Sequence, residues 1–211
     1  MKSQLMKDYL KLSPVLPVVV IENIDDAIPL AYALREGGIN IMEVTLRTEV
    51  ALEAIALIRQ TVPSICVGAG TVNNPDLLKK SIAARAQFLV CPGITDSLLE
   101  AASKTDIPLL PGIATPSEAM KLQALGYSHL KFFPAEAAGG VNMLKSLAGP
   151  LAGLSFCPTG GIDNINSPAY LALDNVVCVG SSWVSTAKLI EQKNWYEISQ
   201  RAREITKGIK L

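Results

Sequence analysis

The chain has 211 residues, of which 49% are hydrophobic and 18% are charged. Its 19 basic residues are balanced by 19 acidic residues, so no net positive charge attracts nucleic acid or an anionic membrane surface. The longest apolar run near the start covers residues 14–21, whereas a membrane span needs about 20 residues. We therefore expect one globular domain over residues 1–211, with neither nucleic acid nor a membrane as a partner.

The cysteines and the histidine limit the chemistry further. The four cysteines are widely separated and form no Cys-x-x-Cys pair, which is typical of reduced thiols in a cytoplasmic protein. The single histidine, His129, excludes a histidine-rich metal site, and no acidic cluster indicates a carboxylate site for Mg²⁺. Charged residues interrupt the first fourteen positions, which therefore lack the apolar segment of a secretion signal. These features predict a cytoplasmic protein with no metal and no other cofactor.

Short β-branched runs alternate with amphipathic stretches along the chain. A first helix is predicted over residues 3–11. The predicted strands span residues 15–21, 41–46, 65–68, 88–91, 109–110, 130–133, 154–157 and 176–180. The predicted helices between them span residues 25–36, 49–60, 75–84, 96–104, 116–125 and 140–147. This alternation indicates an α/β fold with a parallel sheet.

Helix caps and prolines support the same division of the chain into strands and helices. Asn74, Thr95 and Thr115 each precede a predicted helix as an N-cap. Four predicted strands are followed by a proline: Pro92, Pro111, Pro134 and Pro158. Eight strand–helix units in about 200 residues fit a compact (β/α)8 TIM barrel with an extra N-terminal helix. An open doubly wound sheet is the alternative, although the chain lacks a complete G-x-G-x-x-G fingerprint.

The second predicted strand carries charge on one face only. Its even-numbered positions are apolar, whereas its odd-numbered positions include Glu43, Thr45 and Arg47. In a barrel, this row points inward, where a buried charge is costly unless it is paired. Glu43 and Arg47 are therefore candidate site residues. The alternative is a structural ion pair or a solvated strand end.

The sixth predicted strand places a lysine among aromatic residues. His129, Lys131 and Phe133 share one face of this strand. An interior lysine close to Arg47 would favour the uncharged amine, which is the nucleophile that forms Schiff bases with carbonyl compounds. The alternative is a lysine that protects an exposed edge strand.

Small residues follow the last two predicted strands. Gly160 and Gly161 follow the seventh strand, and the run 180–182 (Gly-Ser-Ser) follows the eighth. In barrels, phosphate is commonly held by these two loops and a short helix N-terminus. Ordinary tight turns are the alternative. Thr71 and Thr159 lie just past the third and seventh strands and are candidate ligand contacts. The alternative for Thr71 is a helix cap, and the alternative for Thr159 is a turn hydroxyl.

Five motifs together resemble the 2-keto-3-deoxy-6-phosphogluconate (KDPG) aldolases, which are class I aldolases of the Entner–Doudoroff pathway. Many members also act on 4-hydroxy-2-oxoglutarate (KHG). The motifs are EVTLRT at 43–48, VGAGTV at 67–72, KFFPAE at 131–136, CPTGGI at 157–162 and GSSW at 180–183. The resemblance implies a (β/α)8 barrel, a homotrimer, no metal, and cleavage of KDPG to pyruvate and glyceraldehyde 3-phosphate. It also implies cleavage of KHG to pyruvate and glyoxylate.

The resemblance implies roles for individual residues as well. Lys131 would be the Schiff-base lysine, and Glu43 the acid/base that moves protons through a water molecule. Arg47 and Thr71 would contact the carboxylate of pyruvate, and Phe133 would wall the pocket.

The remaining residues would contact the rest of the substrate. Pro92 would lie beside the pocket, and Thr159 occupies a position tied to substrate stereochemistry. The phosphate end would be formed by Gly160, Gly161, Ser181 and Ser182. Ser181 is a departure from the family, because the best-known members carry Gly-Gly-Ser-Trp where this chain has Gly-Ser-Ser-Trp.

Two other functions remain open at this point. The first is a phosphosugar isomerase or decarboxylase on the same barrel, since a fold does not determine a function. Such an enzyme would not need the nucleophile Lys131. The second is a non-catalytic phosphosugar-binding protein, which would need neither Lys131 nor Glu43.

Overall fold

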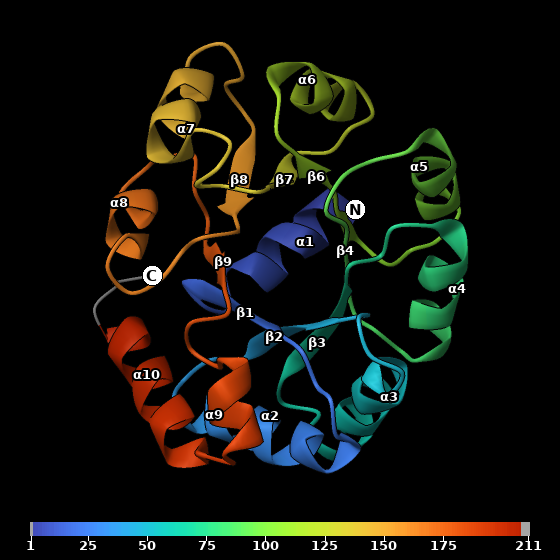
Figure 1. The fold of residues 1–211 in the computed structure, drawn as a ribbon. Helices are drawn as coiled ribbons and strands as arrows, with labels where there is room; N and C mark the ends of the chain where they lie inside the picture. Colours follow the sequence, from blue (N-terminus) through green and yellow to red (C-terminus); the bar gives the residue numbers. More distant parts are fainter. Residues whose placement is uncertain (1, 208–211) are drawn as a thin grey trace.

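The computed structural model describes residues 2–207, in which short parallel strands alternate with helices (Figure 1). The strands are β1 (Val15–Val19), β2 (Ile41–Thr45), β3 (Cys66–Gly70), β4 (Leu89–Val90), β5 (Leu109–Leu110), β6 (Gly112–Ile113), β7 (His129–Phe132), β8 (Ser155–Pro158) and β9 (Val179–Ser181). The helices are α1 (Lys2–Leu10), the 3-10 turn η1 (Ile24–Asp26), α2 (Ala27–Glu36), α3 (Ala51–Thr61), α4 (Pro75–Ala83), α5 (Asp96–Ser103), α6 (Pro116–Ala124), α7 (Gly140–Ala148), α8 (Ser167–Leu171), α9 (Ala187–Glu191) and α10 (Trp195–Lys207).

The strands pair in parallel and form two sheets. One has six strands in the order β5-β4-β3-β2-β1-β9, and the other has three in the order β6-β7-β8. The two sheets part at Pro111, between β5 and β6, because proline has no N–H to donate to a ladder. At the other side, single bridges join Phe156 to Val176 and Thr159 to Gly180. The predicted α/β class and parallel pairing are therefore confirmed, with the ladder divided between two sheets.

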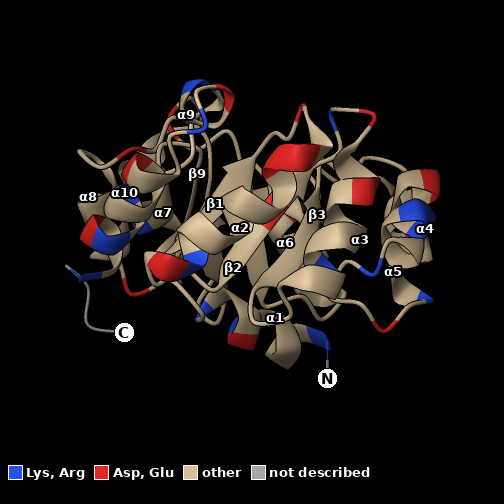
Figure 2. Cartoon of the chain, turned by 90° about the horizontal axis from the view of Figure 1, so that it is seen from below, with Lys and Arg blue, Asp and Glu red and all other residues tan. Residues whose placement is uncertain are grey.

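Two groups of buried side chains lie on opposite faces of the strands. Met42 and Val44 of β2 belong to the larger group, which packs against the surrounding helices. Ile41 of β2 belongs to the smaller group, together with Met6 and Leu10 of α1. Figures 1 and 2 show α1 lying across one end of the strands. The alternation predicted for this strand is thus confirmed, and α1 fills the end where the strands begin.

Most predicted elements are confirmed to within a few residues, the first helix included. The three predicted caps are also present. The side chains of Asn74, Thr95 and Thr115 accept hydrogen bonds from the backbone N–H groups of Leu77, Leu98 and Glu118. Such caps satisfy N–H groups that have no partner within the helix.

Four elements were not predicted: β6, α8, α9 and α10. β6 has two residues, and α8 and α9 have five each, which is too short for a helical or strand period to be visible. α10 is the exception. It packs against α2 through buried Ile198 and Ala202, a spacing of four that is typical of a helix.

The distribution of charged residues on the surface is consistent with the equal numbers of basic and acidic residues. Figure 2 shows basic and acidic residues interspersed over the helices in that view. Within residues 2–207, no helix has both the length and the apolar character of a membrane span. In the same part of the chain, no three His, Cys, Asp or Glu side chains are grouped as metal ligands. All four cysteines are buried free thiols.

Candidate active site

The predicted site residues lie together in one cavity of about 520 Å³. All eleven line it: Glu43, Arg47, Thr71, Pro92, Lys131, Phe133, Thr159, Gly160, Gly161, Ser181 and Ser182. Glu43 and Lys131 lie within β2 and β7, and the other residues lie at the carboxyl ends of strands or in the loops that follow. Because the strands are parallel, these ends meet on one side of the molecule.

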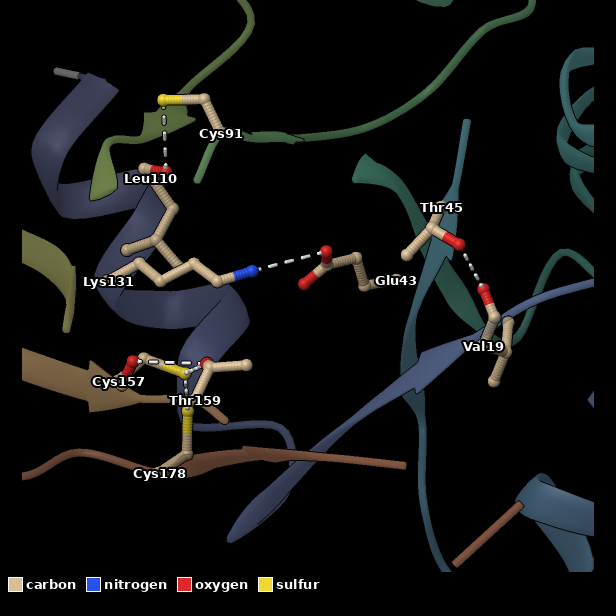
Figure 3. A network of polar contacts seen from close by, with 9 residues as sticks. All are labelled: Val19, Glu43, Thr45, Cys91, Leu110, Lys131, Cys157, Thr159 and Cys178. Atoms are coloured by element: carbon tan, nitrogen blue, oxygen red, sulfur yellow. Dashed lines mark hydrogen bonds and ion pairs between the residues drawn. The ribbon is translucent and has the colours of Figure 1, made fainter. Parts of the chain in front are cut away.

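The centre of the site is an ion pair between Lys131 and Glu43. The Nζ atom of Lys131 lies 3.4 Å from Oε1 of Glu43, and the two residues are only 5% and 1% exposed. Figure 3 shows the two side chains pointing toward each other from β7 and β2. β7 pairs with β6 on one side and β8 on the other, so the alternative of an edge-protecting lysine is wrong. The alternative of a solvated strand end is wrong as well, because Glu43 is buried.

The second carboxylate oxygen of Glu43 has no partner. Oε2 is buried, and no hydrogen-bond donor reaches it within residues 2–207. Leaving such an acceptor unsatisfied costs about 1–3 kcal/mol, and more for a charged group. A donor from a bound ligand would remove this cost. The arrangement therefore suits a group that exchanges protons with a substrate.

Gly70 makes room for this carboxylate, and the sequence reasoning did not identify it. A Cβ atom at position 70 would lie 2.0 Å from Oε1 of Glu43, which is closer than atoms can approach. Gly70 is the last residue of β3 and pairs with Thr45 of β2. A glycine within a strand often marks such a close approach, and the Gly-Ala-Gly of this strand was the available signal.

Arg47 lies beyond the end of β2 and does not continue the strand face that carries Glu43. β2 ends at Thr45, whose hydroxyl donates to the carbonyl of Val19 at 2.9 Å. Arg47 follows in a turn and is exposed at the cavity wall. The charged group in contact with Lys131 is therefore Glu43 rather than Arg47, a correction to the expected neighbour.

Thr71 and Phe133 flank the ion pair. Thr71 has a φ of +62°, which is rare for a β-branched residue and strains the backbone. Strain of this kind is concentrated at functional sites, because surrounding structure must hold it. The Nζ atom of Lys131 lies 5.4 Å from the centre of the Phe133 ring, within the range of a cation–π contact.

Thr159 is fixed by its neighbours on β8 and β9. Its hydroxyl lies 3.3 Å from the carbonyl of Cys157, and its side chain is buried. A Cβ atom at position 180 would lie 2.2 Å from Oγ1 of Thr159, so Gly180 is needed where the strand passes this side chain. Thr159 therefore presents a fixed surface to the cavity.

The two predicted anion loops form the opposite end of the cavity. Gly160 and Gly161 have φ values of +105° and +76°, which strain any other residue. The Ser182 side chain is exposed at the cavity. The Ser181 hydroxyl instead bonds within the protein, donating to the carbonyl of Ile162 at 2.6 Å and accepting from the N–H of Trp183.

Seven further residues complete the wall and were not predicted: Val18, Val20, Ile162, Gly180, Ser185, Thr186 and Ala187. Ser185 is buried, and its hydroxyl has no partner within residues 2–207. Val18 and Val20 come from the first predicted strand, whose apolar composition gave no sign of a cavity wall.

The thiol of Cys91, on which the charges of Lys131 and Glu43 act, is held in its protonated form. Burial raises the pKa of Cys91 to about 11, although its backbone contact with Gly112 and the charge of Lys131 act in the opposite direction. A protonated thiol is a poor nucleophile.

The family described as "Aldolase: KDPG and KHG aldolase" matches residues 6–201. The chain belongs to this family. It is 50% identical over 202 residues to the 2-dehydro-3-deoxy-phosphogluconate aldolase of Dickeya dadantii, covering 96% of this chain and 95% of that protein. It is 48% identical over 205 residues to the KHG/KDPG aldolase of Escherichia coli K12, covering 97% and 96%. The resemblance drawn from the five motifs is confirmed.

Solved structures agree with this assignment. The KDPG aldolase of Legionella pneumophila superposes with a TM-score of 0.93 at 46% identity, covering 95% of this chain and 97% of that one. In that structure, pyruvate is captured as a covalent carbinolamine intermediate. The Zymomonas mobilis enzyme with 3-phosphoglycerate superposes with a TM-score of 0.90 at 44% identity, covering 95% and 94%. The family match disfavours both alternatives, an isomerase or decarboxylase and a non-catalytic binding protein.

Proposed function

We propose that this protein is a class I aldolase that cleaves KDPG to pyruvate and glyceraldehyde 3-phosphate. The buried pair of Lys131 and Glu43 at the base of the cavity carries the proposal. A carbinolamine forms when an amine adds to a carbonyl, and the Legionella relative holds pyruvate in that form. We extend the proposal to KHG, which would yield pyruvate and glyoxylate, because the E. coli relative is a KHG/KDPG aldolase.

The first half of the reaction makes an electron sink. A proton passes from the Lys131 ammonium to the Glu43 carboxylate 3.4 Å away, which leaves a neutral amine and a neutral acid. The amine attacks the C2 ketone of the substrate and forms a carbinolamine. The Glu43 acid then protonates the carbinolamine hydroxyl, which leaves as water. The product is a protonated imine on Lys131, with Glu43 ionised again.

The second half breaks the carbon–carbon bond. The Glu43 carboxylate removes the proton of the C4 hydroxyl, the C3–C4 bond breaks, and its electron pair moves into the imine to give an enamine. The aldehyde is released. Glu43 returns its proton to C3, which restores the imine, and addition of water releases pyruvate. A general acid/base of this kind contributes about 10²–10⁴-fold to the rate.

The other cavity residues bind and orient the substrate. Arg47 and the strained Thr71 contact the pyruvate carboxylate, and Phe133 and Pro92 wall its methyl end. Thr159 determines which configuration at C4 of the substrate is accepted.

The phosphate end rests on the backbone N–H groups of Gly160 and Gly161 and on the Ser182 hydroxyl. Backbone N–H groups that follow one another in a turn form concavities that bind anions. Because the net charge is zero, the preference for phosphate comes from these local donors.

The proposal includes the architecture and the assembly. The division at Pro111 and the single bridges of Phe156 to Val176 and of Thr159 to Gly180 support two sheets that are parts of one (β/α)8 barrel, in a single domain over residues 1–211. The family resemblance supports a homotrimer, whose sedimentation mass would be three times the 22.5 kDa of one chain. The four free cysteines support a cytoplasmic location.

Release of pyruvate tests the function. Purified protein is incubated with KDPG, and separately with KHG, and pyruvate is measured with a coupled dehydrogenase. We expect turnover of both substrates that persists in excess chelator, because the proposed chemistry uses Lys131 and Glu43 alone. No turnover of either substrate, or turnover abolished by the chelator, would contradict the proposal.

A further inference from the structure

Four consecutive carbonyl groups after β8 are each held by a hydrogen-bond donor. The carbonyls of Thr159 and Gly160 accept from the backbone N–H groups of Ala135 and Glu136, at 2.8 and 3.1 Å. The carbonyl of Gly161 accepts from the side-chain amide of Asn166 at 2.8 Å. The fourth, Ile162, accepts from the Ser181 hydroxyl at 2.6 Å. The loop is thus fastened at every peptide from 159 to 162.

The N–H groups in the same stretch are unoccupied. Those of Gly160, Gly161 and Ile162 have no acceptor within residues 2–207. In a trans peptide, the N–H points away from the carbonyl of the same unit. The N–H groups of Gly160, Gly161 and Ile162 share their peptides with the carbonyls of residues 159, 160 and 161, so they are turned away from the loop after β7 and from α8. The carbonyl of Ile162 shares its peptide with the N–H of Asp163, which donates to Oδ1 of Asn166 at 2.9 Å. All three residues line the cavity.

We propose that Ser181 and Asn166 are positioning residues for a bound phosphate ester that they do not touch: Asn166 holds the peptide that carries the Ile162 N–H, and Ser181 holds the next peptide, which fixes the end of the same loop. This inference rests on the proposed function, which supplies the phosphorylated substrate. Backbone N–H groups hold the carbonyls of residues 159 and 160. Within the described residues, the carbonyls of residues 161 and 162 are held only by the two side chains. Without them, these peptides can rotate, and binding must then order them again.

Ser181 has a geometry that serves this purpose. It ends β9, is 5% exposed, and uses its one hydroxyl proton on the carbonyl of Ile162. Its oxygen also accepts from the N–H of Trp183 at 3.1 Å. The hydroxyl therefore ties the loop after β8 to the loop after β9. A glycine at this position would have no hydroxyl and could not make this link.

Asn166 forms the corresponding link from the start of α8. Its Nδ2 donates to the carbonyl of Gly161, and its Oδ1 accepts from the N–H of Asp163 at 2.9 Å. Asn166 is half-buried and lies outside the cavity wall. Neighbouring Asn164 offers a matched control, since it is exposed and makes no side-chain hydrogen bond within the described residues.

Ser181→Ala, Asn166→Ala and the control Asn164→Ala are compared on KDPG and on unphosphorylated KHG. Each of the first two removes the bond to one loop carbonyl and one bond accepted from a backbone N–H. We expect KM for KDPG to rise about three- to ten-fold, with kcat nearly unchanged. KM for KHG should stay within about two-fold, as should both constants in the control. A second readout is inhibition by glycerol 3-phosphate, which should weaken in the same two variants.

Thermal unfolding of each variant separates anchoring from damage to the fold. Equal losses on KDPG and KHG, or unchanged inhibition by glycerol 3-phosphate, would overturn the inference. Failure of the proposed function looks different, because the unmodified protein would then turn over neither substrate. If only one of the two variants unfolds, the other still decides the question.

Discussion

Lys131 and Glu43 meet across the cavity although they belong to different sheets and are 88 positions apart in the sequence. Their charged atoms are 3.4 Å apart, and both side chains are buried. Breaking a buried pair by removing one partner usually destabilises a protein, because the other charge is left alone. A substitution that keeps the size of the side chain is therefore the sharper probe of what the pair does.

Glu43→Gln should remove proton exchange while it preserves the shape of the side chain. We expect KDPG cleavage to fall about 10²-fold or more, the usual contribution of a general acid/base. Exchange of the pyruvate methyl protons with solvent deuterium, followed by NMR, should slow by a comparable factor because it passes through the same enamine. Exchange at the unmodified rate would make Glu43 a structural partner of Lys131 only.

Gly70→Ala should displace the Glu43 carboxylate, since the added Cβ would lie 2.0 Å from Oε1. We expect a loss of cleavage approaching that of Glu43→Gln. The matched control is Gly149→Ala, because a Cβ at position 149 meets nothing within 4 Å. Activity of Gly70→Ala equal to that of the control would show that the position of the carboxylate is not critical.

Ser182→Ala should weaken binding of the phosphate without affecting the chemistry. Hydrogen bonds to charged groups contribute about 1.5–3 kcal/mol, so KM for KDPG should rise about ten-fold or more. Cleavage of KHG and proton exchange on pyruvate should be nearly unaffected, which separates a remote contact from a catalytic one. Equal losses on both substrates would mean that this loop shapes the whole pocket.

His129 should make stability fall on acidification. Burial lowers the pKa of His129, and the nearby charges of Lys7 and Lys11 lower it further. The unfolded chain therefore binds a proton at a higher pH than the folded one, so stability is full above about pH 6.5 and declines as the pH falls below it. Urea unfolding at pH 7.5 and pH 5 measures the decline. His129→Asn should reduce it, and an unchanged decline would assign it to other groups.

Periodicity and local composition predicted most of the fold and the centre of the site. The alternation along β2 placed Glu43 on the inward face, and the aromatic surroundings of Lys131 marked it as unusual. Both indications are local, so a single sequence can carry them. The division of the sheet at Pro111 could not be predicted in this way. The sequence pattern shows that a strand ends at Leu110, but it does not show that a second strand begins at Gly112.

Residues that act through distant contacts could not be predicted in this way. Gly70 matters because β3 lies beside β2, and Asn166 because its amide reaches back to Gly161. Neither residue has a periodic or charged neighbourhood that singles it out. Arg47 was placed on the face of Glu43 by continuing the strand alternation beyond Thr45, whereas β2 ends there and Arg47 follows in a turn.

Reductive trapping tests the central claim most directly. The protein is incubated with pyruvate and borohydride, and the modified residue is located by peptide mass spectrometry. The account predicts one reduced pyruvyl group per chain, on Lys131, and none in Lys131→Met. The absence of an adduct, or an adduct on any other lysine, would contradict it.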